Sequence, residues 1–473
     1  MTGHRQPAAE YDLVGVGIGP FNLALAALAD GAAGEGRTRA LFLEDSERFA
    51  WHPGMLLEGT VLQVPFLADL VSLVDPTSRW SFLNYLREHG RLFPFYFAER
   101  FHIPRQEYDH YCRWVADCLP TCRFGSRVER VSWDADAEHF LVEYRDVGSS
   151  AATTVAARNV VLGVGTAPAI PTVFDGLTGQ RVFHSSRYLD NRASLHTASD
   201  ITLVGSGQSG AEIFLDLLRA QPEYGWRLRW LARTPAFAPM EYSKLGLEHF
   251  TPDYVEYFRQ LPADTRERLI PAQWQLYKAI SDDTIGAIYD LLYERGIGGQ
   301  WPDVTLAPNV EVTSASAERA GYRLNCRQVE QRHDFTVTTD RVVLATGYAP
   351  REVEFLRPLR QLIDWDSLGR YRVDGDYRVA LDPQVTGGLY VQNAEMHSHG
   401  VGAPDLTLGA WRAARILNHL TGRTVYPLPD RAAFTTFGVP PSATETSEPS
   451  EVSDSGEAAG HGRSVPSRVG ARH

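Results

Sequence analysis

Two glycine-rich turns, far apart in the chain, constrain its fold more than any other feature. Residues 17–22 read GIGPFN, and residues 205–210 read GSGQSG. Each turn follows an apolar run and opens a helical pattern. In that order the first glycine permits a tight turn, the second lets backbone approach a pyrophosphate, and the helix N-terminus offers N–H groups to the phosphates. The sequence therefore predicts an α/β fold with two Rossmann-like dinucleotide-binding domains.

The residue after the next strand of each module distinguishes the two predicted ligands. The apolar run 40–43 ends at Glu44, where a carboxylate can bond a ribose hydroxyl of an unphosphorylated adenosine, as FAD requires. The run 228–232 ends at Arg233 and Thr234, where a cation accommodates the 2′-phosphate of NADPH. The plain alternative for Arg233 is a solvated surface arginine.

Composition limits the class of protein. The chain has 473 residues, of which 44% are hydrophobic and 22% charged, as in a globular protein of two or three domains. A net charge of −12 without a Lys/Arg run argues against nucleic-acid partners. No apolar stretch suits a membrane span or a signal peptide, so we expect a cytoplasmic location and no membrane partner. The cysteines lack zinc-site spacing, so we expect no metal and four structural thiols: Cys112, Cys118, Cys122 and Cys326.

The order of apolar runs predicts that the second module is inserted in the first. Buried strands with glycine turns at 160–168 and 341–348 mark the crossings out of the first module and back. Aromatics at helical spacing in the insert indicate a helical substrate-binding insertion, or simply core. The expected domains are a FAD-binding domain at 11–195 and 341–438 and an NADPH-binding domain at 196–340 that includes the insertion at 238–297. A flexible leader at 1–10 and a disordered tail at 439–473 would flank them.

Further stretches, at 14–23, 51–55, 69–77, 82–86, 204–212, 345–348 and 397–406, carry a family resemblance. Together they resemble the flavin-dependent N-hydroxylating monooxygenases of siderophore biosynthesis, which include lysine, ornithine and diamine hydroxylases. Asn22, where a third glycine is usual, is itself typical of this family. The resemblance implies that NADPH reduces FAD, that reduced flavin combines with O2, and that a C4a-hydroperoxyflavin hydroxylates a neutral primary amine. It also implies a homo-oligomer, a tetramer or a dimer.

The resemblance also implies the site residues. Gln63 and His52 would lie along the isoalloxazine as the candidate catalytic residues, with a structural amide and a core histidine as the plain alternatives. The implied FAD-binding residues are Gly17, Gly19, Pro20, Asn22, Glu44, Trp51, His52, Gln63, Thr346, Gly347, Asp405 and Leu406. The implied NADPH-binding residues are Gly205, Gly207, Gln208, Ser209, Gly210, Arg233 and Thr234.

The substrate pocket departs from the amino-acid hydroxylases of the family at two places. Ala68 stands where those enzymes carry a lysine that pairs with the substrate carboxylate, and Leu247 stands where the ornithine enzymes carry an asparagine. A buried carboxylate without a partner is costly, so we expect a diamine, putrescine or cadaverine. Its second ammonium needs an acid, for which Glu241 is the first candidate and Asp405 the second; Glu241 could instead pair with Lys244.

Three alternatives stay open. A lysine N6- or ornithine N5-monooxygenase could bind the carboxylate through Lys244, Lys278, His397 or His399. A flavin disulfide reductase shares the two-dinucleotide layout, but the cysteines do not form its redox pair. An uncoupled NADPH oxidase or flavin-binding protein without an organic substrate is compatible with the sequence.

Overall fold

The computed structural model describes residues 10–32 and 38–440. The predicted flexible leader and disordered tail lie almost wholly outside these residues. By its contacts the chain divides into Met1–Thr435 and Thr436–His473. The helices and strands below all belong to the first of these units.

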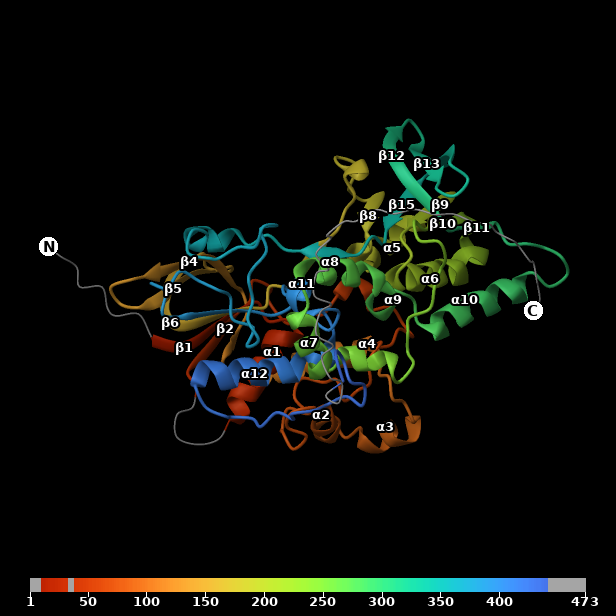
Figure 1. The fold of residues 1–473 in the computed structure, drawn as a ribbon. Coiled ribbons are helices and arrows are strands. Elements are labelled where there is room, and N and C mark those ends of the chain that lie inside the picture. The colour runs from red at the N-terminus through yellow and green to blue at the C-terminus, as the bar shows by residue number, and fades with distance from the viewer. Residues whose placement is uncertain (1–9, 33–37, 441–473) are drawn as a thin grey trace, which may run out of the picture. The chain divides into compact units, whose positions relative to one another are not determined.

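The first sheet has seven strands in the order β3-β2-β1-β6-β5-β4, with β17 also paired to β6 (Figure 1). Its centre is parallel, because β1 pairs in parallel with β2 and β6, and β17 pairs in parallel with β6. A hairpin-like antiparallel extension, β4 to β6, widens one edge. The strands are β1 (Glu10–Val16), β2 (Ala40–Leu43), β3 (Cys122–Arg123), β4 (Ser126–Asp134), β5 (His139–Asp146), β6 (Ala152–Leu162) and β17 (Gly388–Val391).

The second sheet is parallel throughout, in the order β11-β10-β9-β15-β8. Its strands are β8 (Val182–His184), β9 (Asp200–Val204), β10 (Arg227–Leu231), β11 (Val304–Ala307) and β15 (Arg341–Leu344). Two strands therefore differ from the prediction, since β8 and β15 were placed in the first domain and pair in the second sheet. The reason is physical: β9, which carries the second glycine turn, needs neighbours on both edges, and β15 supplies one of them.

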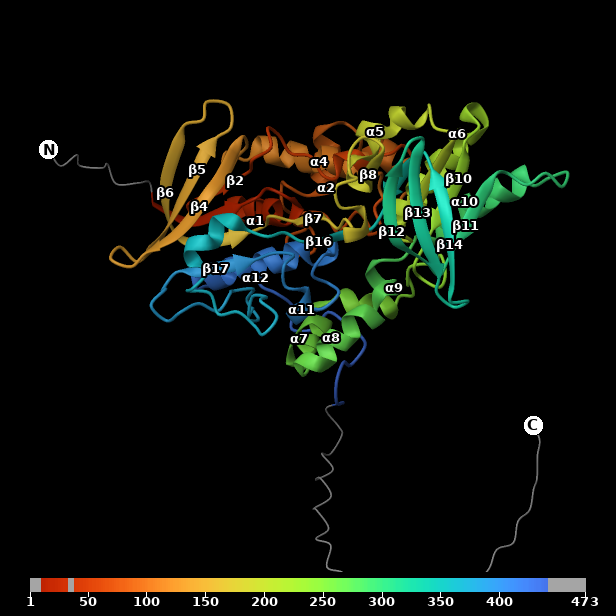
Figure 2. The same cartoon turned by 90° about the horizontal axis from the view of Figure 1, so that it is seen from above.

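A two-stranded ribbon lies where the chain passes between the sheets. In it β7 (Thr166–Pro168) pairs antiparallel with β16 (Tyr348–Pro350). The predicted crossings out of the first module and back thus lie side by side. A third sheet, a meander of β12 (Val310–Glu318), β13 (Gly321–Gln328) and β14 (His333–Thr339), shares a buried cluster with β8, β10 and β15 and lies beside the second sheet in both views (Figures 1 and 2).

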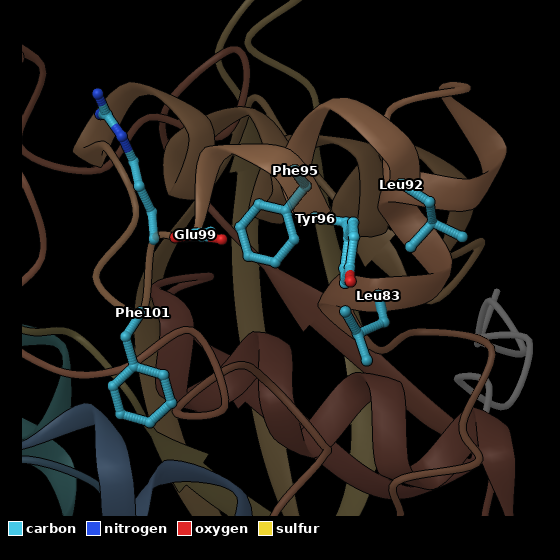
Figure 3. A pocket seen from close by; sticks show the side chains of 7 residues that line it. Leu83, Leu92, Phe95, Tyr96, Glu99 and Phe101 are labelled. Atoms are coloured by element: carbon cyan, nitrogen blue, oxygen red, sulfur yellow. The ribbon is translucent and has the colours of Figure 1, made fainter.

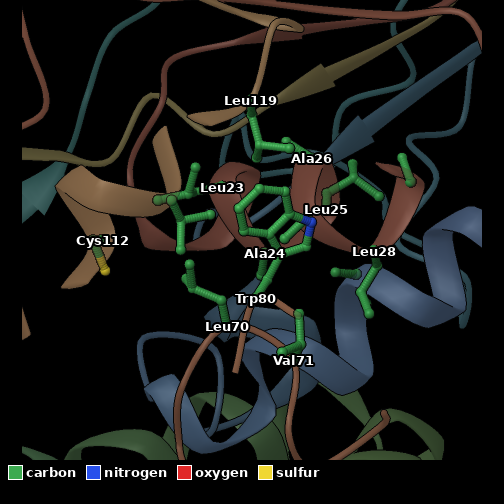
Figure 4. Packing of buried hydrophobic residues seen from close by; sticks show 14 of the residues in the cluster. Leu23, Ala24, Leu25, Ala26, Leu28, Leu70, Val71, Trp80, Cys112 and Leu119 are labelled. Atoms are coloured by element: carbon green, nitrogen blue, oxygen red, sulfur yellow. The ribbon is translucent and has the colours of Figure 1, made fainter. Parts of the chain in front are cut away.

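Helices bury the first sheet. The residues of α1 (Pro20–Gly31) from Asn22 to Ala29 are all buried, because α4 (Arg105–Cys118) and α12 (Gly409–Thr421) both pack against this helix. Trp80, Leu70 and Val71, from the loop before α2 (Phe82–Glu88), complete this core (Figure 4). The glycine turn predicts an almost wholly apolar helix directly after the first strand, as α1 is.

The predicted insertion is helical, as its periodicity indicates. It contains η4 (Gly246–Phe250), α7 (Pro252–Gln260), α8 (Ala263–Ala272), α9 (Trp274–Tyr277) and α10 (Asp282–Arg295). Its last helix packs on α6 (Gln208–Tyr224), while α7 and α8 contact α11 (Met396–His399), from the part of the chain that follows the second sheet. The remaining helices are α3 (Leu92–Ala98) and α5 (Tyr188–Leu195). Within residues 10–32 and 38–440, no helix has the length and apolar character needed to cross a membrane.

Candidate functional site

The first glycine turn joins β1 to α1. Gly17 has a φ of +86°, and a Cβ built on it would lie 2.5 Å from the Gly163 carbonyl oxygen, so only glycine fits. The fully buried Asn22 side chain donates to the Gly17 carbonyl at 2.8 Å and accepts from Gln392 at 2.7 Å. Asn22 therefore fixes the shape of the turn from inside, and it would affect a bound cofactor through that shape.

Glu44 follows β2 and fixes the same turn. Its Oε2 accepts from the Ile18 N–H at 2.9 Å, and its Oε1 accepts from the Ser46 N–H at 3.1 Å. The next helix begins at Pro20, after Gly19, and no side chain caps it. The N–H groups of its first turn are thus left for an anionic group.

The second turn joins β9 to α6. Gly205 has a φ of +120°, and a Cβ on it would lie 2.1 Å from the Ala345 carbonyl oxygen. The Trp230 indole donates to the Gly205 carbonyl at 2.6 Å. Gly210 lets α6 come close, since its Cβ would lie 2.7 Å from that same carbonyl oxygen. The helix follows Gly207 without a side-chain cap, so this turn offers a second cradle for phosphates.

Arg233 and Thr234 follow β10, the strand next to β9. The Arg233 side chain is exposed, and within residues 10–32 and 38–440 it has no ion-pair or hydrogen-bond partner. Thr234 is half-buried and donates from Oγ1 to the Ala236 carbonyl at 2.9 Å. A free cation thus stands at the strand end where the 2′-phosphate of a dinucleotide would be recognised.

Gln208, the first residue of α6, connects the second turn to Gln63. Its Oε1 accepts from Gln63 Nε2 at 3.2 Å and from the Ser281 N–H at 2.7 Å. Its Nε2 donates to Glu212 at 2.8 Å and lies 3.1 Å from Thr284 Oγ1. The Gln208 side chain is thus bonded to protein groups, whereas its neighbour in the predicted set, Ser209, is half-buried at the start of the helix.

An ion pair reinforces this connection. Arg105, the first residue of α4, donates from both terminal nitrogens to the two carboxylate oxygens of Glu212 at 2.8 Å each. The two side chains are 12% and 4% exposed. Burial raises the pKa of Glu212, and Arg105 opposes that rise. A bidentate pair of this kind fixes both position and angle, so it holds α6 against the module that carries the first turn.

Trp51 and His52 lie in the predicted flavin region. The Trp51 N–H donates to Asp109 at 2.7 Å, and His52 adopts a left-handed conformation with φ of 48°. His52 is exposed to solvent, yet many protein atoms surround its ring. Desolvation by these atoms, and secondly the Arg105 charge, lower its pKa to about 4. His52 is therefore neutral near pH 7, 5.5 Å from the Tyr348 ring between centroids.

Thr346 and Gly347 hold the ribbon strand whose Tyr348 contacts His52. Thr346 donates from Oγ1 to the Ala169 carbonyl at 2.6 Å. Gly347 has a φ of +78° and accepts from His184 Nε2 at 2.9 Å. The two predicted residues therefore fix the chain where β16 begins, and Gly347 is exposed there.

Asp405 and Leu406 precede α12. Asp405 accepts from the Thr407 N–H at 2.8 Å, and burial raises the pKa of its carboxyl group. The Tyr242 hydroxyl donates to the Gln63 carbonyl at 3.4 Å. Burial, and secondly the Asp405 charge, raise the pKa of Tyr242 to about 12. Asp405 is thus close enough to act on the phenol that contacts the Gln63 loop.

The three predicted substrate residues lie in different settings. Ala68 is buried, on the same loop as Gln63. Glu241 is exposed, and its carboxylate accepts from the Ser243 N–H at 2.6 Å. Hydrogen bonds from the Ser243 side chain first, and from this N–H second, lower the pKa of Glu241. Leu247 is 39% exposed. The structure brings Ala68 to the loop, uses Glu241 to close its own turn, and leaves Leu247 at the surface.

The comparison with protein families decides the class of the chain. The model of the L-lysine 6-monooxygenase/L-ornithine 5-monooxygenase family matches residues 9–350. The chain belongs to this family.

Individual relatives in the family are close over most of their length. The chain is 44% identical to the rhizobactin siderophore biosynthesis protein RhbE of Rhizobium meliloti, over 93% of this chain and 97% of that protein. It is 41% identical to the putrescine N-hydroxylase of Shewanella oneidensis, over 90% and 84%. The FAD-bound crystal structure of DfoA, the cadaverine monooxygenase of the desferrioxamine pathway in Erwinia amylovora, superposes with a TM-score of 0.87 at 40% identity, covering 91% and 99%. The predicted family and fold are confirmed.

Several residues of this site were not predicted. Arg105 and Glu212 are 107 positions apart, so no local pattern pairs them. Glu212 alone gives a signal, as an acid on the helix of a glycine turn whose neighbours are all apolar. Tyr242 gives no signal in the sequence, because a phenol next to an acid does not indicate a contact with a distant loop. Tyr348 follows the predicted Gly347 directly.

The four cysteines are free thiols. Burial raises the pKa of Cys112 well above its usual range, that of Cys122 to about 12 and that of Cys326 to about 11. These three thiols stay protonated near pH 7 and are poor nucleophiles.

Proposed function

We propose that this chain is an FAD- and NADPH-dependent N-monooxygenase that hydroxylates one amine of putrescine or cadaverine for hydroxamate siderophore biosynthesis. The observation that carries the proposal is the contact between Gln63 and Gln208. Through it the loop of the first module meets the first residue of the helix that leaves the second glycine turn. Two dinucleotides that exchange a hydride must approach each other, and this contact joins a loop of the first module to the helix that leaves the second turn.

The residues at the first turn fit FAD. Gly17 permits the close approach, the uncapped start of α1 leaves N–H groups for the pyrophosphate, and Glu44 stands at the strand end for a ribose hydroxyl. Trp51, His52, Gln63, Thr346, Gly347, Asp405 and Leu406 would border the rest of the cofactor. When bound, the flavin supplies the transfer of one oxygen atom from O2 to the amine.

The residues at the second turn fit NADPH. Gly205, Gly207, Ser209 and Gly210 would form the cradle, and Arg233, which has no partner among the described residues, offers its guanidinium to the 2′-phosphate. Gln208 contributes through its backbone and through its hold on Gln63, since protein groups occupy its side chain.

His52 and Gln63 would act on the amine side as hydrogen-bonding groups. A histidine with a pKa of about 4 is a neutral imidazole, so it does not protonate the amine that must react in its neutral form. The Gln63 side chain is oriented by Gln208, and its carbonyl by Tyr242. His52 and Gln63 therefore orient the reactants, and the proton that the amine must lose passes to solvent.

The charges around the pocket favour a diamine over an amino acid. Ala68 provides no cation, and the Arg105 guanidinium is already paired with Glu212. Burial lowers the pKa of His397 and His399, which keeps both neutral. Lys278 lies over the Tyr277 ring, 5.1 Å from its centroid. Ala68, His397 and His399 thus offer no charge to a substrate carboxylate, and a lysine or ornithine substrate would depend on Lys244 or Lys278.

The second ammonium would be held by Asp405 and the Tyr242 hydroxyl. A carboxyl group whose pKa burial raises gains most from a cation at its side, because the pair restores the charged form. Glu241 is the second candidate to hold this ammonium, since it adjoins Tyr242 but its carboxylate already accepts a hydrogen bond from Ser243.

We further propose the domain limits given above, with β8 and β15 moved to the NADPH-binding domain, a cytoplasmic location, and a homo-oligomeric assembly. The names of the relatives, putrescine N-hydroxylase, siderophore biosynthesis protein and cadaverine monooxygenase, support the substrate class.

The test is a hydroxylamine assay beside NADPH consumption, with putrescine, cadaverine, L-ornithine and L-lysine on the FAD-loaded enzyme. Product from a diamine alone would support the proposal. Product from lysine or ornithine would overturn the substrate argument, and NADPH consumption without hydroxylamine would leave an uncoupled oxidase. In Asp405→Asn, which keeps the hydrogen bond to Thr407, we expect the diamine KM to rise at least about 10-fold from the lost charge pair. In the matched Glu241→Gln we expect less than about a 2-fold change; the reverse order would exchange the two acids.

A further inference from the structure

Arg412 differs from the surface arginines of the chain. Arg100, for example, is exposed and lines a groove with Phe95 and Tyr96 (Figure 3). Arg412, in the first turn of α12, is 0% exposed, and so is Glu395, with which it forms an ion pair at 2.9 Å. Taking two charges out of water is costly, and apolar side chains of similar size often stabilise a fold as well as such a pair does. Stability alone therefore does not explain this pair.

The Arg412 guanidinium holds the segment before Asp405. Its Nη2 donates to the Ala403 carbonyl at 2.7 Å and to the Gly402 carbonyl at 3.4 Å. The Gly402 carbonyl also accepts from the Asp405 N–H at 3.2 Å. Gly402 and Ala403 are buried, and a Cβ on Gly402 would lie 2.6 Å from the Leu408 side chain, so the segment is closely packed. The backbone that leads to Asp405 is thus fixed by one buried side chain.

The Arg412 guanidinium also lies against the first glycine turn. Its central carbon, Cζ, is 4.6 Å from the centre of the Phe21 ring and 5.4 Å from that of the Tyr377 ring. Phe21 is the second residue of α1 and belongs to the turn at 17–22. A guanidinium stacks favourably on aromatic faces. Arg412 therefore contacts both the start of α1 and the segment before Asp405.

Glu395, just before α11, is the counterion of this arginine. Its Oε2 accepts from the Ala394 N–H at 2.7 Å, and its Oε1 lies 2.9 Å from Arg412 Nη1. Burial raises the pKa of Glu395, and the Arg412 charge opposes that rise. Since Glu395 meets Nη1, the other terminal nitrogen, Nη2, is left for the two carbonyls.

We propose that Arg412 is a positioning residue for FAD. With Glu395 as its counterion, it holds the segment before Asp405 against Phe21. Two borders of the cofactor site, the first glycine turn and Asp405–Leu406, then keep their places relative to each other. Because FAD is proposed to lie at these residues, this role rests on the proposed function, but it does not depend on which amine is hydroxylated.

FAD titration and urea unfolding of the full-length apoprotein test the proposal. Arg412→Met removes the donors and leaves Glu395 without its counterion. We expect the FAD dissociation constant to rise at least about 10-fold, as for lost hydrogen bonds from a charged group, and the urea midpoint to fall. In Arg412→Met/Glu395→Gln both charges are gone, so the midpoint should recover most of this loss while the FAD dissociation constant stays raised.

The matched control is Arg415→Met on the same helix. The Arg415 side chain pairs with Asp376, and both are 36% exposed, so this variant should leave the FAD dissociation constant unchanged. Arg412→Lys keeps the proposal testable if Arg412→Met does not fold. A single ammonium stays beside Glu395 but lacks the fork that reaches Glu395 and Ala403 from separate nitrogens, so the FAD dissociation constant should still rise several-fold.

Two results would overturn the proposal. One is a FAD dissociation constant that returns to the wild-type value together with the urea midpoint in the double variant, because the pair would then only stabilise the fold. The other is an unchanged constant in Arg412→Met and Arg412→Lys. Gly19→Ala, in the first turn, separates this failure from that of the proposed function. Weaker FAD binding in Gly19→Ala beside unchanged Arg412 variants overturns the role of Arg412 alone, whereas unchanged binding in Gly19→Ala overturns the place of FAD and this role with it.

Discussion

The two glycine turns of this chain need glycine for the same steric reason, but different side chains surround them. In both, a Cβ on the first glycine would collide with a backbone carbonyl, at 2.5 Å for Gly17 and 2.1 Å for Gly205. The first turn is held by side chains, because the Asn22 amide donates to the Gly17 carbonyl and one Glu44 oxygen accepts from the Ile18 N–H. Beside the second turn, the Arg233 guanidinium has no partner in the part of the chain that the structure describes. The difference teaches that glycine sets the shape of such a turn, while one residue after the next strand sets what it recognises.

The first prediction breaks the first turn and has the largest effect. Gly17→Ala forces a side chain into a left-handed conformation, which costs about 1–2 kcal/mol, and into contact with the Gly163 carbonyl. We expect the FAD dissociation constant to rise by more than about 100-fold and the free energy of unfolding of the apoprotein to fall by at least about 2 kcal/mol. Flavin titration and urea unfolding measure these two quantities.

The control for this substitution lies two residues away. Gly19 has an ordinary extended conformation, and a Cβ on it would come no nearer than 4.0 Å to the Gly163 carbonyl oxygen. Gly19→Ala should therefore leave the apoprotein as stable as the wild type while still weakening FAD binding. Equal loss of stability in both variants would show that steric closure at Gly17 is not what shapes the turn.

The second prediction sharpens the contrast in charge. Arg233→Ala should lower kcat/KM for NADPH about 10- to 100-fold, the range of a lost charge-assisted hydrogen bond, and should leave kcat/KM for NADH unchanged. Steady-state kinetics with both nucleotides measure the split. Arg319→Ala, another exposed arginine of the same module, is the matched control. A parallel loss with NADH would mean that Arg233 does not read the 2′-phosphate.

The third prediction concerns the hydrogen bond between Gln63 and Gln208, which links the two modules. Gln208→Ala removes the bond to Gln63 and takes one hydrogen-bond partner each from the Glu212 carboxylate and the Ser281 N–H. We expect anaerobic flavin reduction by NADPH to slow about 5-fold, from roughly 1 kcal/mol of lost hydrogen bonding, with FAD affinity unchanged. The double variant with Gln63→Ala should cost little more than Gln208→Ala alone. If the losses in the rate of flavin reduction were fully additive, Gln63 and Gln208 would act independently of each other.

Local signals made much of this fold predictable. Glycine, strand and helix follow one another within a few residues, so both turns, the apolar helix α1 and the contrast of Glu44 with Arg233 could be read from the chain. The sheet to which a buried strand belongs could not, because β8 and β15 find their partners through long-range pairing. Both runs are short and apolar, and nothing in such a run names its neighbour.

The candidate site was predictable only where a motif carried it. Arg105 and Glu212 come from helices 107 positions apart, and only the packing of two modules joins them. Glu241 was chosen for its charge, but a short acidic side chain readily bonds its own turn, and here it does so with Ser243. The neighbouring Tyr242 then reaches the Gln63 loop.

The smallest expected effect comes from His52, whose ring contacts that of Tyr348. Its pKa is about 4 in the folded protein and 6.5 in the unfolded chain, from desolvation first and Arg105 second. The unfolded chain therefore binds the proton first, so stability is lost as the pH falls from 6.5 towards 4. Glutamine does not titrate, so in His52→Gln the free energy of unfolding should decline less steeply across this window, as urea unfolding at several pH values would measure. Because the ring is open to solvent, we expect a modest change in slope, and an unchanged slope would mean that His52 is as easily protonated in the folded protein as in the unfolded chain.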